Sequence, residues 1–223
     1  MSDICRVQGC SRQTRSWYGT MCEKHRQRWR RHGDPLQPTI HKHELKPYRE
    51  YVEGLVERDS SGKIKAGLKR LRDILEKKCL VVYQDFWGRG RPMNRVWVKA
   101  CTEILSVLRA SDEIGPAVVV ASMFLLWKDR SYRFVSDRGF YFQLVRMFRS
   151  LAPQNTGVYY DHMTGKPKRV YKDLSSSVME YIGSTILTPY VSWVAAVLNK
   201  RNNENRAQEE ARRLFTEGMG HID

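Results

Sequence analysis

The stretch CRVQGCSRQTRSWYGTMCEKHRQRWRRHGDP, residues 5–35, contains the pattern from which the rest of the sequence is interpreted. Its spacing is C-x4-C-x11-C-x2-H, formed by Cys5, Cys10, Cys22 and His25. Thiolates and imidazoles are preferred zinc ligands, and a closed structural site needs four of them. A segment this short cannot bury a core by itself, so a bound metal would supply its folding free energy. We therefore predict a structural Zn²⁺ site on these four residues.

A run of cations follows the last ligand and is predicted to form a basic helix. Lys24, Arg28 and Arg31 fall at i, i+4 and i+7, which places them on one helical face. Cations on such a face can contact the phosphates of nucleic acid. Phosphate contacts position a protein without reading the base sequence. Trp29, inside the run, is expected to pack against the metal-binding loop. The residues of this segment expected to bind nucleic acid are Lys24, Arg26, Arg28, Arg30 and Arg31.

This spacing, with the string RWRRHGDP over residues 28–35, resembles a zinc-binding module common near the N-terminus of bacteriophage proteins. The resemblance covers about residues 5–36 and implies a phage or mobile-element origin and a module that docks on DNA. Many proteins with this module carry an HNH endonuclease domain after it. The histidines available for such a site are His41, His43 and His162, and none has the accompanying motif. Nuclease activity is therefore not carried over from the resemblance.

The whole chain is strongly basic, with 39 Lys+Arg against 24 Asp+Glu and a formal net charge of +15. The excess is uneven, because residues 175–223 contain five cations and six anions. A cationic body predicts a polyanion partner, here taken as double-stranded DNA. The near-neutral end predicts a protein-facing role, so residues 175–217 are expected to bind a protein partner or a second copy of the chain.

Cysteine usage and hydropathy predict a cytoplasmic protein, which means the bacterial host cytoplasm if the chain is phage-encoded. The first three residues lead directly into the Cys motif without an apolar leader. Five cysteines in such a chain favour reduced thiols and metal binding over disulfides, and Cys79 and Cys101 are expected to be buried. The longest apolar run, Ala117 to Trp127, is far shorter than the ~20 residues of a membrane span, so no membrane is expected as a partner.

The remaining sequence predicts a mainly helical body with one β-hairpin. Helical patterns cover residues 48–58, 68–79, 94–110, 115–127, 137–151, 175–187 and 189–198. β-forming residues flank a Gly-containing turn between 158 and 171, which predicts the hairpin. Two helices, a cationic third helix and a basic-tipped hairpin have the order of a winged helix-turn-helix, in which the third helix enters the major groove. A helical domain with an unrelated hairpin is the alternative.

The helix expected over 137–151 has an apolar face and an opposite face with three arginines and a phenylalanine. No acid interrupts this second face, so it is interpreted as a nucleic-acid-binding surface, with the hairpin tip assisting. A solvated face without a partner is the alternative. The residues expected to contact nucleic acid here are Arg138, Phe142, Arg146, Arg149, Lys166, Lys168 and Arg169.

These patterns divide the chain into four expected segments: a zinc-binding basic module over 1–36, a linker and helical connector over 37–92, a helical or winged-helix-like nucleic-acid-binding domain over 93–174, and C-terminal helices over 175–223. No phosphate-binding loop, catalytic triad order or carboxylate cluster is visible in the sequence, so no enzyme is predicted. The predicted function is a zinc-containing DNA-binding accessory or regulatory protein of phage or mobile-element type. The alternatives are a divergent HNH-like endonuclease and a phage-encoded protein that binds a host protein complex.

Overall fold

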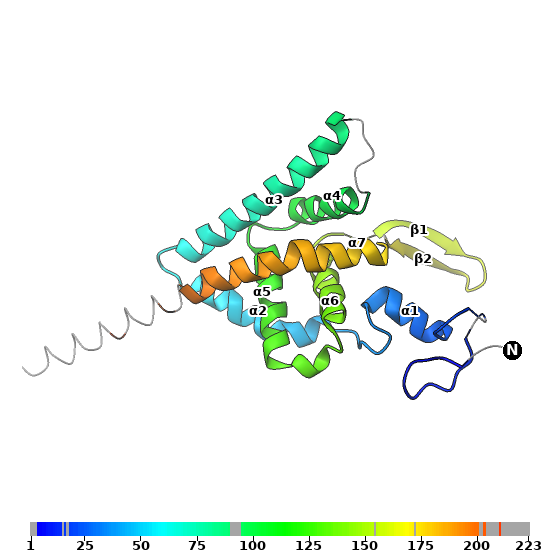
Figure 1. Ribbon diagram of the computed structural model, residues 1–223. Coiled ribbons are helices and arrows are strands. Elements are labelled where there is room, and N and C mark those ends of the chain that lie inside the picture. Colours follow the sequence, from blue (N-terminus) through cyan, green and yellow to red (C-terminus); the bar gives the residue numbers. More distant parts are fainter. Residues whose placement is uncertain are drawn as a thin grey trace, which may run out of the picture.

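The computed structural model describes residues 4–14, 16, 18–89, 95–153, 155–171, 173–200, 203 and 210. Within them the chain is mainly helical, with a two-stranded hairpin at one end (Figure 1). This confirms the predicted fold class. The helices are α1 Glu23–His32, α2 Lys42–Glu57, α3 Lys63–Arg89, α4 Arg95–Ala110, α5 Gly115–Asp129, α6 Asp137–Arg149 and α7 Ser176–Tyr181.

Shorter elements connect and extend these helices. A 3-10 turn, η1 (Ser131–Arg133), precedes α6, and a π-helical turn, η2 (Ile182–Leu187), follows α7. Strand β1 (Asn155–Asp161) pairs antiparallel with β2 (Lys166–Tyr171), so the hairpin predicted near 158–171 is confirmed.

One cluster of buried apolar side chains holds the helical body together. It runs from Ile40 to Leu198 and draws on every helix from α2 onward. All residues from Gly115 to Met123 in α5 are buried, as expected of a helix that is apolar on most sides. In Figure 1 the C-terminal helix crosses the body, with α3 and α4 on one side and α5 and α6 on the other. The three segments that the sequence separated after residue 36 therefore share one core.

The segment before α2 is fixed to the body rather than being a free linker. The buried amide of Gln37 donates to the Arg133 carbonyl (2.9 Å) and accepts from the Val135 N–H (3.0 Å). The Ile40 N–H donates to Gln143 of α6 (3.2 Å). α1 is thus joined to the body by a short, hydrogen-bonded connection.

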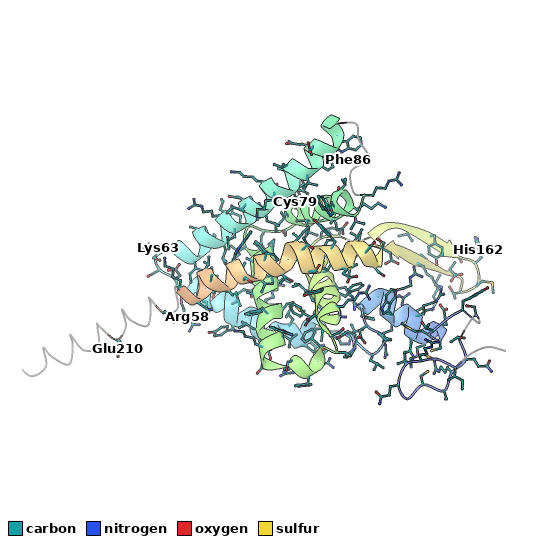
Figure 2. The ribbon with its side chains drawn as sticks, viewed as in Figure 1. Arg58, Lys63, Cys79, Phe86, His162 and Glu210 are labelled. Carbon is teal, nitrogen blue, oxygen red and sulfur yellow. The ribbon has the colours of Figure 1, made fainter. Side chains whose placement is uncertain are left out.

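α2 begins at Lys42, six residues before the predicted start after Pro47. The Glu44 carboxylate accepts a hydrogen bond from the His41 N–H (3.0 Å), which caps the helix upstream. α3 is also longer than predicted, because it continues through residues 80–83 and on past Phe86, at its far end in Figure 2. Local patterns located these two helices but not their ends.

A new helix was expected to begin at Pro189, yet a single helix runs from Ser176 to Lys200. The η2 turn widens this helix just before the proline, and the Thr188 hydroxyl donates to the Gly183 carbonyl (2.7 Å). The wider turn accommodates a residue that lacks an N–H donor.

The helix Ser176–Lys200 is the one described segment that is long and apolar enough to cross a membrane, with a hydropathy of 1.4 over its most apolar 18 residues. Its Ile182, Leu187, Tyr190 and Val194 side chains are fully buried against the body. A core helix satisfies the same criteria of length and composition, and one side of this helix packs in the core.

Candidate metal centre

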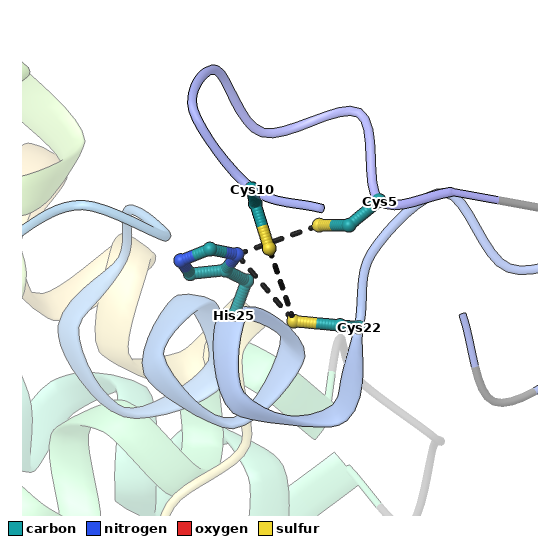
Figure 3. A group of neighbouring side chains, drawn as sticks. All are labelled: Cys5, Cys10, Cys22 and His25. Carbon is teal, nitrogen blue, oxygen red and sulfur yellow. Dashed lines mark hydrogen bonds between the residues drawn. The ribbon is translucent and has the colours of Figure 1, made fainter. Parts of the chain in front are cut away.

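Cys5, Cys10, Cys22 and His25 come together at the start of α1 (Figure 3). Their ligand atoms all lie within 4.8 Å of one another. The sulfurs of Cys10 and Cys22 are 3.9 Å apart, and His25 Nδ1 lies 3.4 Å from Cys5 Sγ and 3.5 Å from Cys22 Sγ. Tetrahedral zinc, with Zn–S of about 2.3 Å and Zn–N of about 2.0–2.1 Å, requires sulfur–sulfur and sulfur–nitrogen separations of about 3.8 and 3.6 Å. The four side chains therefore fit one tetrahedral ion, with Nδ1 as the imidazole ligand atom.

The loop before α1 is folded around these ligands by backbone hydrogen bonds. The Cys5 N–H donates to the Arg12 carbonyl (2.9 Å), and the Cys10 N–H donates to the Val7 carbonyl (3.0 Å). Gly9 lies between them with φ 76°, a left-handed conformation that glycine adopts without strain. This tight turn brings the two thiols of the C-x4-C pair to the same side of the loop.

The second ligand pair is positioned by α1 itself. Cys22 is the N-cap residue of the helix, and His25 lies in its first turn. The C-x2-H spacing therefore places both side chains on the same end of the helix, facing the loop.

Local hydrogen bonds also favour the metal-binding form of Cys5. Burial raises the pKa of this thiol, but the N–H groups of Cys22 and Val7 and the His25 ring lower it to about 6. A thiolate is the form that binds zinc. Four protein ligands leave no open position for substrate, which is the arrangement of a structural rather than a catalytic metal.

The exposed side of α1 carries most of the cations predicted to bind nucleic acid. Lys24, Arg30 and Arg31 are exposed and Arg28 is half-buried, and none of these four forms an ion pair with a described residue. Arg26 differs, because its guanidinium pairs with Glu23 one turn away (2.8 Å).

The C-terminal half of α1 is anchored on α6. The Arg138 guanidinium stacks on the Trp29 ring at 4.4 Å, donates to the Gly33 carbonyl (2.6 Å) and pairs with Glu180 (3.1 Å). Trp29 was expected to pack against the metal-binding loop; the contact that the structure gives its ring is with Arg138 of α6. Arg138, expected at a nucleic-acid surface, joins α1 to the body.

The last residue of α1 strengthens this anchor. His32 Nδ1 accepts hydrogen bonds from Gln143 Nε2 (3.1 Å) and Arg146 Nη1 (2.8 Å). Burial, followed by the charge of Arg146, lowers the pKa of His32 to about 4, so its ring is neutral near pH 7. In a neutral imidazole the single lone pair on Nδ1 is the acceptor that these two donors share.

The stripe predicted on the third helix does not face solvent. Phe142 is fully buried, so the prediction that it meets nucleic acid is wrong. The Arg149 guanidinium pairs with Glu103 (2.7 Å), and their side chains are 12% and 2% exposed. Because α6 contacts α1, α5, α7 and η2, it is an interior helix. The winged helix-turn-helix prediction, which requires an exposed third helix, is not supported.

The hairpin carries the remaining predicted cations. Lys166 is exposed, whereas the Lys168 ammonium pairs with Asp161. The Arg169 side chain lies outside the described part of the structure, as does most of 201–217 in the predicted protein-binding segment. The nucleic-acid-binding residues predicted from sequence did not include Tyr159 and Tyr160, which are exposed on the hairpin. The predicted hairpin could have indicated them, because a two-stranded ribbon leaves aromatic side chains uncovered.

The histidines considered for a nuclease lie in separate elements. His41 and His43 stack at the start of α2 (5.5 Å between ring centroids), and His162 lies at the hairpin tip (Figure 2). Among the described residues, the Cys5–His25 group is the one place where three or more metal-binding side chains meet. No observation in that part of the chain favours the HNH alternative.

No family model matches this chain, and no curated protein or solved structure is significantly similar to it. The resemblance to a phage module therefore rests on residues 5–36 alone. Function has to be inferred from the chemistry of the chain's own surfaces.

Proposed function

We propose that this protein binds nucleic acid through cations of α1, on a module stabilised by zinc. The observation that carries the proposal is the set of cations on α1 that form no ion pair with a described residue: Lys24, Arg28, Arg30 and Arg31. Clustered like charges repel one another, and a polyanion relieves that repulsion. Phosphates of a nucleic-acid backbone match this spacing and charge.

The two anchors of α1 support the proposal. The metal ligands fix its first turn, and His32 and Gly33 fix its last turn on α6. A helix held at both ends presents its cations in one geometry, which lowers the entropic penalty of binding. The module would then dock on the backbone without reading sequence, because phosphate contacts carry no base information.

The resemblance of residues 5–36 to a zinc-binding module of bacteriophage proteins suggests the kind of protein. The proposal is an accessory or regulatory DNA-binding protein of phage or mobile-element type, acting in the bacterial cytoplasm. A second candidate, binding to a host protein complex, is favoured by the end of α3, where Trp87 is 68% exposed and its ring contacts the rings of Tyr83 and Phe86. Large exposed apolar side chains in one place are typical of protein-binding surfaces.

Salt-dependent binding to duplex DNA tests the proposal. Four phosphate contacts predict a slope of about −4 in a plot of log K against log salt, and Arg28→Ala with Arg31→Ala should reduce its magnitude by about 2. The matched control is Lys63→Ala with Lys65→Ala, which removes the same charge from two exposed positions at the start of α3.

The control double variant should keep the wild-type slope. Binding without salt dependence would overturn the proposal. So would equal weakening by both double variants, because that outcome would indicate a response to net charge rather than to α1.

A further inference from the structure

The β1–β2 hairpin exposes aromatic side chains on both of its faces. Tyr159 and Tyr160 are 51% and 56% exposed, and Met163 in the turn is 94% exposed. Consecutive residues of a strand point to opposite faces, so neither face of this ribbon is covered at these tyrosines. An isolated two-stranded hairpin is marginally stable, and a ligand on one of its faces would stabilise it.

The two tyrosines differ in what they contact. The Tyr160 ring packs edge-on against His162 (5.3 Å between centroids), and its hydroxyl donates to the Gly165 carbonyl (3.1 Å). Tyr160 is thus part of the hairpin tip. The Tyr159 side chain makes no hydrogen bond or ring contact with any described residue, and its ring is available to a ligand.

The face that carries Tyr159 also carries cations. Tyr159 is paired across the strands with Lys168, and the next pair on that face is Asp161 with Lys166. Asp161 neutralises Lys168, while Lys166 is exposed. An exposed aromatic ring beside a cation is the combination by which proteins hold single-stranded nucleic acid, with bases stacked on rings and phosphates near cations.

The base of the hairpin is connected to α1. β2 ends at Tyr171, shortly before α7, and the Ser176 hydroxyl of α7 donates to the Arg30 carbonyl of α1 (3.5 Å). In Figure 1 the hairpin and α1 leave the body at the same end. One extended strand can therefore contact the cations of α1 and then the hairpin.

We propose that the hairpin is a stacking site for unpaired bases of single-stranded nucleic acid, with Tyr159 as the stacking ring. The site rests on the proposed function, because the cations of α1 hold the backbone of the same strand. Bases in a duplex are stacked on one another, so they do not offer a face to this ring. The chain's net charge of +15 and the exposed Lys166 on the same face as Tyr159 favour a polyanion over a protein partner.

The test compares a single-stranded oligonucleotide with the duplex of the same sequence by fluorescence anisotropy, using the full-length zinc-loaded protein. Tyr159→Ala should weaken single-strand binding about 5- to 150-fold, the range that one lost stacking contact gives, and leave duplex binding within about twofold. Tyr159→Phe keeps the ring and should bind like the wild type. The matched control is Tyr132→Ala, since Tyr132 is 78% exposed on η1, outside the hairpin.

Several outcomes separate this site from the α1 surface. If Tyr159→Ala binds the single strand like the wild type while Arg28→Ala with Arg31→Ala weakens both probes, the stacking site is wrong and the α1 surface stands. If Tyr159→Phe weakens binding as much as Tyr159→Ala, a hydroxyl contact replaces stacking and the inference fails. If the wild type binds neither probe, both proposals fail, and the exposed hairpin is better assigned to a protein partner.

Discussion

At the scale of single residues, His32 links the metal module to the body through its protonation state. Its pKa is lowered from 6.5 to about 4, first by burial and then by the positive charge of Arg146. The unfolded chain therefore binds this proton at a higher pH than the folded chain. The stabilisation by neutral His32 is complete above about pH 6.5 and is lost as the pH falls toward 4.

This predicts that the thermal midpoint of the metal-loaded protein decreases as the pH is lowered from 7.5 to 4.5. In His32→Asn this decrease should be smaller. Asn offers an acceptor to Arg146 but does not titrate. Acid release of metal lowers both curves alike, so the difference between the two profiles reports His32. His162→Ala, at the exposed hairpin tip, should keep the wild-type profile, and identical profiles for His32→Asn and the wild type would contradict the prediction.

Residue types allowed the Cys5, Cys10, Cys22 and His25 group, which could hold a metal ion, to be predicted from sequence, because few side chains bind zinc and their spacing limits the geometry. The role of the α6 arginines could not be predicted in the same way. A guanidinium that pairs with a buried carboxylate, as Arg149 does with Glu103, gives the same helical stripe as one that faces water. The partner lies 46 residues away in the chain, beyond the reach of a local pattern.

At the scale of elements, the end of α1 depends on a glycine for two reasons. Gly33 has φ 81°, and a Cβ there would lie 2.6 Å from the Arg138 carbonyl and 2.7 Å from the Phe142 ring. Gly62, before α3, has a similar φ of 66° but nothing within 4 Å of its Cβ position. A side chain at Gly62 would meet backbone strain alone, whereas a side chain at Gly33 would meet both backbone strain and a steric clash.

Gly62→Ala should lower the free energy of unfolding by about 1–2 kcal/mol, the strain of a left-handed residue with a side chain. Gly33→Ala should lower it by clearly more, because α1 must also move away from α6. Urea denaturation monitored by circular dichroism measures both changes. Equal losses in the two variants would show that α1 is not closely packed at this point.

Helices could be predicted where their apolar pattern was long, while their ends depended on interactions that the pattern does not include. α2 extends past Pro47 because Glu44 caps it, and the C-terminal helix passes Pro189 because η2 absorbs the irregularity. A proline in the sequence usually indicates a helix boundary. In these two helices the proline lies inside the helix instead.

At the scale of the whole molecule, charge and composition predicted a basic region and a near-neutral C-terminal region. They did not predict how these regions pack together. The sequence suggested breaks near residues 36, 92 and 174, yet α4 packs against both α3 and α7 in one core. Contacts between distant helices decide this, and no local pattern encodes them. The break near 36 is the one with a physical counterpart, because the core begins at Ile40 and no residue of α1 is buried.

That division predicts how the molecule responds to metal removal. Among the described residues up to the end of α1, the buried ones are Cys5, Cys22 and Thr14, so a bound metal would supply most of the stability of this module. The body has its own core and does not include the ligands. Chelation should therefore unfold the loop and loosen α1, while the body keeps its cooperative thermal transition.

Hydrogen exchange followed by mass spectrometry measures this response segment by segment. Peptides within residues 4–33 should lose protection after chelation, and peptides of α5 should keep it. Cys22→Ser should reproduce the change without chelator, whereas His43→Ala, outside the ligand set, should leave both segments protected. Loss of protection throughout the body would mean that the metal stabilises the whole fold, and unchanged protection in 4–33 would mean that the four ligands do not hold a structural metal. Because the proposed phosphate contacts lie on α1, the metal-free protein should also lose its salt-dependent binding to DNA while its body remains folded.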